Sequence, residues 1–439
     1  MSKKNRAKHS PLLNVVLSFA IVIFIGTLLL LLPFSLKEGQ SLSFVDALFT
    51  SASAVCVTGL VPIPSIAETF SVFGKIVLAL LIQIGGLGFV TIAIFIFIAL
   101  GMKIGIYNRY LAKEALNQSS AKGVVKLIIL IVKTTFTIEF IGFVLNLFVF
   151  TKDYSFIDAC GISAFHAISA FNNCGMDILG ANSLMAYKDN ILLNISTTLM
   201  IILGGIGFVV LQDVKQNKRW SKLFPHTKIV IKVTISLILI GMVLLKVIEG
   251  DSITWLQAFF HSVSSRTAGF ATTSFANLRE ATLLVLIVLM FIGASPSSTG
   301  GGIKTTTFYT MFKSIFAFAC GKKAITYHRK IAEETKLRAF TLTTLAIGLI
   351  VVATFAIVLL EPSLNFMSIF FEVTSAFGTV GLSVGITAGL SPISKLIICL
   401  VMFFGRLGPL TILSLWNKNW NRASDDSDVD YINAKIIIG

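Results

Sequence analysis

Long apolar runs separated by short polar connections extend over almost the whole chain. Eight of these runs are about 20 residues long or longer, which is the length that a helix needs to cross a bilayer. They span residues 13–34, 74–100, 125–150, 190–212, 228–248, 281–318, 340–360 and 393–416. The pattern predicts eight transmembrane helices.

A shorter apolar segment of about 10 residues lies between the two runs of each successive pair. The four segments are 44–55, 157–171, 254–265 and 366–377. They are too short to cross a membrane, and re-entrant half-helices occur only where they line a cavity or are buried in protein. The predicted fold class is therefore an all-α polytopic membrane protein with four helix–pore-helix–helix repeats around one central pore.

The sequence inside the four units repeats as well. We place the units at 13–100, 125–212, 228–318 and 340–416, with cytoplasmic segments at 1–12 and 417–439. A glycine follows each half-helix and a phenylalanine lies ten positions before it; the pairs are Phe49 and Gly59, Phe165 and Gly175, Phe259 and Gly269, and Phe371 and Gly381. The motif at 85–89 recurs at 204–208 and 405–409, whereas the third unit departs from it after Gly293. Agreement at four places makes accidental similarity a poor explanation.

Composition supports the membrane assignment. The 439 residues are 55% hydrophobic and 13% charged, against about 45–50% and about 25% in soluble domains. The five cysteines are scattered, without the spacing of a disulfide framework or a zinc site, and we expect them to be buried as small apolar residues.

The net charge of +15 follows the topology of the chain. Basic residues gather within 3–8, 103–126, 215–232 and 313–338, whereas the alternate connections carry mainly acidic residues. This alternation is the positive-inside rule, and it predicts that both termini of this multi-pass protein lie in the cytoplasm. It argues against nucleic-acid binding and favours contact with the lipid bilayer.

The four glycines predict a cation filter. A dehydrated K⁺ needs oxygens in place of its water shell, and rings of backbone carbonyls supply them. We therefore predict filter strands at 55–59, 171–175, 265–269 and 377–381, the last of which contains Thr-Val-Gly. The predicted filter residues are Val57, Thr58, Gly59, Asn173, Cys174, Gly175, Thr267, Ala268, Gly269, Thr379, Val380 and Gly381. The alternative is that each glycine only ends a half-helix, which is the better explanation for one repeat but not for four.

The sixth apolar run is interrupted by a polar, glycine-rich stretch at 293–305. Irregular backbone at this depth must border protein or a water-filled cavity, so we predict an intramembrane gate loop at 294–305. Its predicted gate residues are Ser297, Ser298, Thr299, Gly300, Gly301, Gly302 and Lys304. A simple kink is the alternative, although three consecutive glycines exceed what a kink needs.

Arg406 lies about 14 residues into the last apolar run, where a charge costs on the order of 2.5–3.5 kcal/mol. We predict that it projects below the filter and limits ion flux, with pairing to a carbonyl or an acid as the structural alternative. Glu139 and His166 are the other polar residues in apolar segments, and we expect them to pack against neighbouring repeats. Nothing in the sequence resembles a nucleophile, paired-carboxylate or metal constellation, so an enzyme is not expected.

At these residues the chain resembles the Trk/Ktr/HKT superfamily of K⁺ transporters, and most closely the KtrB-type membrane subunits of bacterial Ktr systems. The resemblance extends from about residue 13 to the C-terminus. It is carried by the segments 58–60, 82–89, 166–175, 266–270, 375–382 and 405–409.

The resemblance implies a K⁺-conducting subunit in a bacterial cell membrane, in the form of a homodimer with one pore in each protomer. It also implies a cytosolic RCK-type regulatory ring, similar to KtrA or KtrC, that binds ATP or ADP and moves the loop at 294–305. Na⁺ often activates transport in this group. In the family a glycine at the position of Gly59 accompanies K⁺ selectivity.

Two other classes remain as alternatives. A secondary transporter with alternating access commonly has inverted repeats, whereas the four repeats predicted here all face the same way. A membrane enzyme would need clustered His, Asp or Glu residues at the interface, and the sequence contains no such cluster.

Overall fold

The order helix, short helix, helix occurs four times in the computed structural model, which describes residues 11–116, 120–180 and 183–408. The predicted cytoplasmic segments 1–12 and 417–439, apart from residues 11 and 12, lie outside the described residues, as does the end of the predicted run 393–416. The first unit contains α1 (Pro11–Leu30), α2 (Phe44–Cys56), α3 (Ile66–Thr69), α4 (Val72–Leu87) and α5 (Phe89–Ala99), and α6 (Ile106–Ala115) follows it.

The other three units follow the same order. The second contains α7 (Val124–Phe150), α8 (Phe156–Phe171), α9 (Ile191–Gly205) and α10 (Phe208–Asn217); the third contains α11 (Pro225–Glu249), α12 (Trp255–Ser264), α13 (Glu280–Phe291) and α14 (Thr305–Ala319); the fourth contains α15 (Glu333–Leu360), α16 (Phe366–Gly378) and α17 (Pro392–Leu407). Four described helices are long and apolar enough to cross a membrane, or up to six if each bent pair counts as one span.

The short helices α2, α8, α12 and α16 correspond to the predicted half-helices. Each begins at a polar N-cap whose side chain accepts a hydrogen bond from the first turn: Ser43, Ser155, Thr254 and Asn365. Phe49, Phe165 and Phe371 are buried in the core as the repeat predicts, but in the third unit Phe260 is fully buried and Phe259 only partly. The buried phenylalanine of α12 is therefore one position later than in our alignment.

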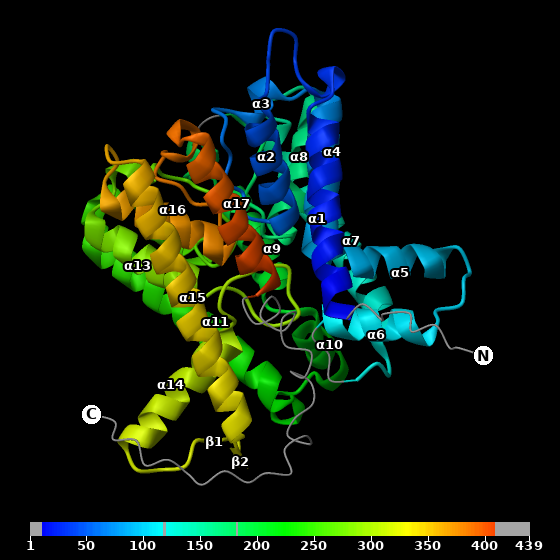
Figure 1. Cartoon of the computed structure of the whole chain (residues 1–439), viewed down its shortest axis with the longest axis vertical. Coiled ribbons are helices and arrows are strands. Elements are labelled where there is room, and N and C mark those ends of the chain that lie inside the picture. The colour runs from blue at the N-terminus through cyan, green and yellow to red at the C-terminus, as the bar shows by residue number, and fades with distance from the viewer. Residues whose placement is uncertain (1–10, 117–119, 181–182, 409–439) are drawn as a thin grey trace, which may run out of the picture.

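Two of the predicted spans are sharply bent. The helices α4 and α5 meet at 96°, and α9 and α10 meet at 95°. The bends fall at Gly88 and Gly207, whose φ values of 82° and 96° are open to glycine but strained for other residues. The runs 74–100 and 190–212, each predicted as one transmembrane helix, are therefore each broken into two helices. The helices α5 and α6 project sideways from the base of α1 and α4 (Figure 1).

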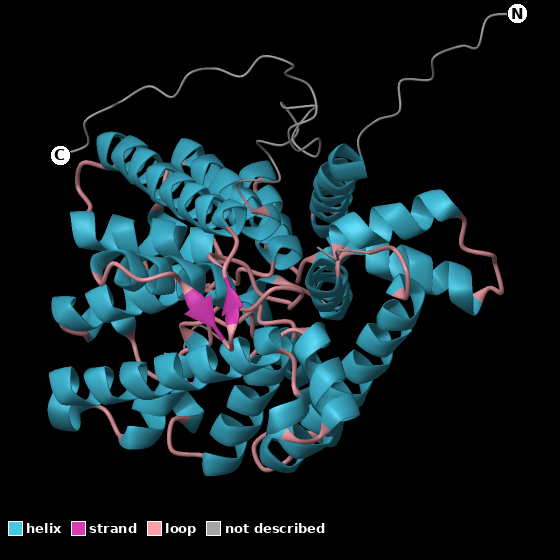
Figure 2. Ribbon diagram, turned by 90° about the horizontal axis from the view of Figure 1, so that it is seen from below, coloured by secondary structure: helices cyan, strands magenta, loops and turns pink. Residues whose placement is uncertain are grey.

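A small hairpin lies at the end of the molecule that carries the basic connections. Strands β1 (Ile325–Thr326) and β2 (Arg329–Lys330) pair antiparallel, and Figure 2 shows them beneath the helices in the view from below. The sequence pattern does not predict this hairpin, because its strands are only two residues long.

Candidate functional site

The four filter glycines form one closed ring in which each glycine lies against a carbonyl of the next repeat. An added Cβ would come within 2.0 Å of Cys174 O at Gly59, 2.1 Å of Ala268 O at Gly175, 2.1 Å of Val380 O at Gly269 and 2.1 Å of Thr58 O at Gly381. The contacts run from repeat one to two, three, four and back to one. Since any side chain would collide with a backbone oxygen, the ring explains why glycine occupies all four positions.

The residue two positions before each glycine has the same unusual backbone. Val57, Asn173, Thr267 and Thr379 all have positive φ, at 57°, 59°, 83° and 50°. This conformation is uncommon for residues other than glycine and occurs most often at strained functional sites. The predicted strands are consequently shorter than expected: α2 continues to Cys56 and α16 to Gly378, so only the last three residues of these two segments are outside the helix.

Backbone amides of the ring are held by the pore helices. Ser53 Oγ accepts a hydrogen bond from Gly59 N at 3.0 Å, and Ser375 Oγ accepts one from Gly381 N at 3.1 Å. Thr58 Oγ1 is fully buried and has no hydrogen-bond partner among the described residues. Among the described residues, no backbone N–H donates to the carbonyl oxygens of Thr58, Cys174, Ala268 or Val380.

Glycines of the inner helices allow close packing beneath this ring. An added Cβ at Gly85, Gly204 or Gly405 would come within about 2 Å of a carbonyl at the end of that repeat's pore helix, Val55 O, Phe171 O or Phe377 O. In the third repeat Gly293 instead meets Gly301 O at 2.3 Å. The third repeat therefore departs from the others where the sequence predicts, because the loop at 292–304 takes the place of the close helix contact.

This loop closes on itself at its base. Ile292 and Ile303 form a β-bridge, and Ile303 N donates to Phe291 O at 3.2 Å. Ser295 Oγ and Thr305 Oγ1 lie 2.9 Å apart and also join the two ends of the loop at its base. The interruption is a closed loop between α13 and α14 rather than the simple kink that we kept as an alternative.

The tip of the loop lies against the filter strands. Gly301 N donates to Thr379 Oγ1 at 2.9 Å, and Thr299 Oγ1 donates to Phe171 O at 3.2 Å. An added Cβ at Gly300 would come within 2.3 Å of Thr267 Oγ1. Two of the strained threonines at the base of the filter thus contact the glycines of the loop directly.

Arg406 reaches from α17 to this loop. Its guanidinium donates to Thr299 O in the loop and to Gly85 O and Gly86 O at the end of α4, the last at 3.0 Å. The structural alternative, pairing with carbonyls, therefore describes its contacts, and one of these carbonyls belongs to the loop itself.

The other predicted gate residues hydrogen-bond to nearby backbone carbonyls. Lys304 Nζ donates to Gly300 O at 2.6 Å. Ser297 Oγ donates to Leu116 O, and Ser298 Oγ donates to Ser295 O. Gly302 completes the loop with a φ of 66°.

The sequence does not predict one buried hydrogen-bond network. Asn172, next to the filter residue Asn173, donates from Nδ2 to Gln83 Oε1 at 2.8 Å and to Glu139 Oε1 at 3.0 Å. Glu139 also accepts from Gln83 Nε2 of the first repeat at 3.3 Å, so it packs against a neighbouring repeat as expected. Its other partner, Asn172, lies in the predicted filter strand 171–175. His166 likewise has a packing environment, with Nε2 2.8 Å from Thr197 Oγ1 and its ring 4.8 Å from that of Phe270.

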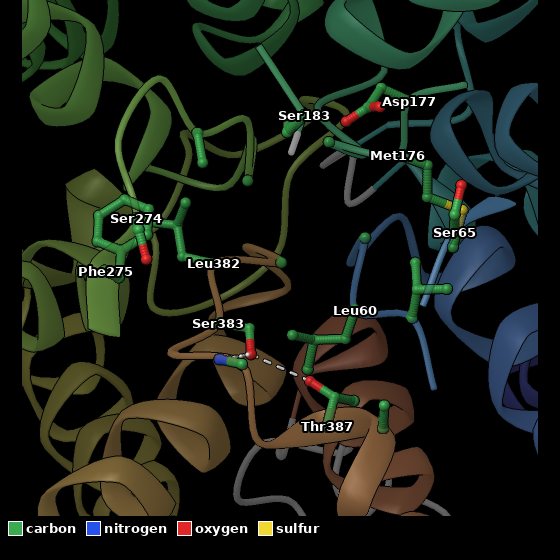
Figure 3. Close-up of a pocket in the computed structure, with 18 of the residues that line it drawn as sticks. Leu60, Ser65, Met176, Asp177, Ser183, Ser274, Phe275, Leu382, Ser383 and Thr387 are labelled. Carbon is green, nitrogen blue, oxygen red and sulfur yellow. Dashed lines mark hydrogen bonds between the residues drawn. The ribbon is translucent and has the colours of Figure 1, made fainter. Parts of the chain in front are cut away.

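An open cavity of about 450 Å³ lies above the filter ring, and all four filter glycines contribute to its wall (Figure 3). Among the described residues that line it, Asp177 is the only titratable one, and Leu179 N donates to its Oδ1 at 3.1 Å. Burial raises the pKa of Asp177 to about 6, so its carboxylate is mainly ionised at pH 7. Among the described residues, no group of three or more His, Cys, Asp or Glu side chains could hold a metal ion.

Comparisons with known proteins agree over the whole chain. The family model "TrkH: Cation transport protein" matches residues 1–422. "Ktr system potassium uptake protein B" of Bacillus subtilis is 37% identical over 443 residues, which are 98% of this chain and 97% of that protein. "Potassium/sodium uptake protein NtpJ" of Enterococcus hirae is also 37% identical and covers 100% of this chain and 99% of the relative.

A solved structure has the same overall fold as this chain. The potassium transporter TrkH from Vibrio parahaemolyticus superposes with a TM-score of 0.73 over 95% of this chain and 87% of that one, at 20% sequence identity. The chain is therefore an all-α polytopic membrane protein, as the pattern of apolar runs predicts.

Proposed function

The chain belongs to the TrkH family of cation transport proteins, and on that premise we propose that it is a K⁺-conducting subunit of a bacterial uptake system. The family is one of transporters, so the enzyme alternative is set aside. The closed ring of four glycines and four carbonyls is the observation that carries the proposal. Rings of backbone carbonyls replace the hydration shell of K⁺ in selective pores.

Selectivity in this proposal depends on the twelve predicted filter residues. The carbonyls of Thr58, Cys174, Ala268 and Val380 make one layer, and the buried hydroxyl of Thr58 adds an oxygen without an internal partner. The four short helices direct their C-terminal, partially negative ends toward this point, which favours a cation there. The names of two relatives include potassium, which supports K⁺ as the cargo.

We propose that the loop at 294–305 is the gate. It contacts Thr379 of the filter and is held by Arg406 from the fourth repeat, so movement of the loop would open or close the path below the ring. The Bacillus relative is named as a component of a Ktr system. We therefore expect a cytosolic RCK-type ring that binds ATP or ADP to move the loop, a homodimer as the working unit, and Na⁺ as an activator.

The test is flux of K⁺ and Na⁺ into proteoliposomes that contain the wild-type chain or Gly59→Ser. We expect the wild type to prefer K⁺, and the variant to lose most of that preference because its side chain meets Cys174 O. Gly39→Ser is the matched control: Gly39 also has a positive φ, 79°, but nothing lies within 4 Å of an added Cβ. Identical selectivity in all three proteins would contradict the filter.

A further inference from the structure

Four residues from the four repeats stand two positions beyond the filter glycines. They are Val61, Asp177, Ala271 and Ser383, and all four line the cavity above the filter. The pseudo-fourfold ring of glycines beneath them implies that they form a second ring at the mouth of the pore. Three positions of this ring are neutral, and Asp177 carries its only charge.

In the part of the chain that the structure describes, no Lys, Arg or His side chain pairs with Asp177. None of the ion pairs among the described residues includes it, and the rest of the cavity lining contains no Lys, Arg or His. Figure 3 shows Asp177 beside Ser183 on the wall of the cavity. Leu179 N donates to Oδ1, and the side chain of Ser183 also hydrogen-bonds to the carboxylate. Because an ionised carboxylate has about four acceptor sites, it keeps acceptor capacity for a ligand.

The size of the cavity indicates the state of that ligand. A volume of about 450 Å³ corresponds to on the order of 15 water molecules at about 30 Å³ each. A monovalent cation therefore fits with its hydration shell intact, before it reaches the narrow carbonyl ring. A carboxylate at a concave, low-dielectric mouth raises the local concentration of cations.

We propose that Asp177 forms an outer binding site for a hydrated monovalent cation, which supplies the filter with ions when external K⁺ is scarce. The proposal rests on the proposed function, since it assigns a recruiting step to the same pore. The site acts by charge and not by fit, so it concentrates K⁺, Rb⁺ and Na⁺ alike and leaves discrimination to the glycine ring.

The other ionisable groups near the mouth are placed differently. Glu372 of α16 is buried behind the fourth outer loop and accepts from Thr387 Oγ1, and His261 of α12 lies 3.1 Å from Thr272 Oγ1. Asp153 accepts a hydrogen bond from Tyr187 outside the cavity lining. Asp189, on the same outer loop as Asp177, is exposed and does not line the cavity. It is the matched control for loss of one negative charge.

The experiment measures initial Rb⁺ uptake against Rb⁺ concentration in proteoliposomes with the full chain, at low and high ionic strength set by choline chloride. For Asp177→Asn we expect KM to rise about three- to tenfold with an unchanged maximal rate and K⁺/Na⁺ preference. The difference shrinks at high ionic strength, because salt screens an exposed charge. Asp177→Glu and Asp189→Asn behave like the wild type.

A gain of charge provides the converse test. Ala271→Asp adds a second carboxylate to the same ring and lowers KM further, even if Asp177→Asn does not fold. An unchanged KM in Asp177→Asn, or a change of maximal rate or selectivity in place of KM, overturns the proposal. If the wild type passes no cation, the proposed function fails independently of the outer site. The outer site is then tested by measuring whether Rb⁺ raises the unfolding temperature of the purified protein. If the site exists, Asp177→Asn abolishes this stabilisation; if Asp177→Asn is stabilised like the wild type, the outer site is wrong.

Discussion

Lys395 of α17 donates a hydrogen bond to Asp46 of α2 across 2.8 Å, although 349 positions of the sequence separate them. The side chains are only 10% and 22% exposed. The pair joins the last repeat to the first on the outer side of the filter, at the same junction where Gly381 lies against Thr58 O. It therefore closes the ring of repeats with a charged contact in addition to the backbone contacts.

Breaking this pair destabilises the closed ring. For Lys395→Met we expect a loss of about 1–3 kcal/mol of stability, between the values for exposed and buried pairs, because Asp46 is left partly buried without its cation. The double variant Asp46→Asn/Lys395→Met recovers part of that loss. Thermal unfolding in detergent measures it, and purely additive losses in the double variant would show that the two residues do not interact.

The buried network at Asn172 gives a second prediction. Glu139→Leu removes the acceptor of the Gln83 side-chain amide and one of the acceptors of Asn172 Nδ2, and we expect it to cost about 1–3 kcal/mol. Glu139→Gln keeps one acceptor and costs less. Because Asn172 lies in the predicted second filter strand, Glu139→Leu also lowers K⁺ selectivity in the flux assay, whereas Glu68→Gln on the surface changes neither property. Wild-type stability and selectivity in Glu139→Leu would contradict the prediction.

The third prediction concerns the hydrogen bonds by which Arg406 holds the gate loop. Replacing it with Gln weakens the charge-assisted hydrogen bonds to Thr299, Gly85 and Gly86, which are worth about 1.5–3 kcal/mol each. Since 1.4 kcal/mol is a factor of ten, we expect basal K⁺ flux without a regulatory partner to rise about tenfold or more. Arg338→Gln on the exposed face of α15 is the control. Unchanged flux and apparent K⁺ affinity in Arg406→Gln would remove Arg406 from the gate.

The features that the sequence predicts well are those that a single local pattern determines. Apolar length separates spans from half-helices, and a glycine recurs wherever a backbone oxygen occupies the place of a side chain. The gate interruption is visible because three consecutive glycines cannot continue a helix. All of these signals lie within a few consecutive residues.

The features that it misses depend on distance or on surroundings. The helix α5 is as apolar as a spanning helix, so the hydropathy pattern does not show the bend between α4 and α5 at Gly88. Asn172 and Gln83 are 89 positions apart, and the partners of Arg406 are carbonyls, which every residue carries. The one-residue shift from Phe259 to Phe260 is not visible in the alignment, because both positions are phenylalanine.

The last prediction concerns pH and the outer ends of the helices. Glu361, just after α15, accepts hydrogen bonds from Ser391 N and Ser394 Oγ, both at 2.8 Å, at the start of α17. Hydrogen bonds from Ser391 hold the pKa of Glu361 below its ordinary range. A carboxylate at a helix N-terminus also gains from the helix dipole. Glu249 makes the equivalent contacts with Arg279 N and Thr282 Oγ1 in the third repeat.

The sign of the effect follows from the depressed pKa. Folding favours the ionised carboxylate, so its contribution is present above the unfolded pKa of about 4.3 and is lost as pH falls through the lower folded value. We expect Glu361→Gln to lower the unfolding temperature at pH 7, by the equivalent of about 1 kcal/mol. At pH values below the folded pKa of Glu361 the variant and the wild type converge, because protonation removes the same charge. Glu38→Gln in an outer loop is the control. If the difference in unfolding temperature between the wild type and Glu361→Gln does not change with pH, the side chain stabilises α17 by packing and not by charge.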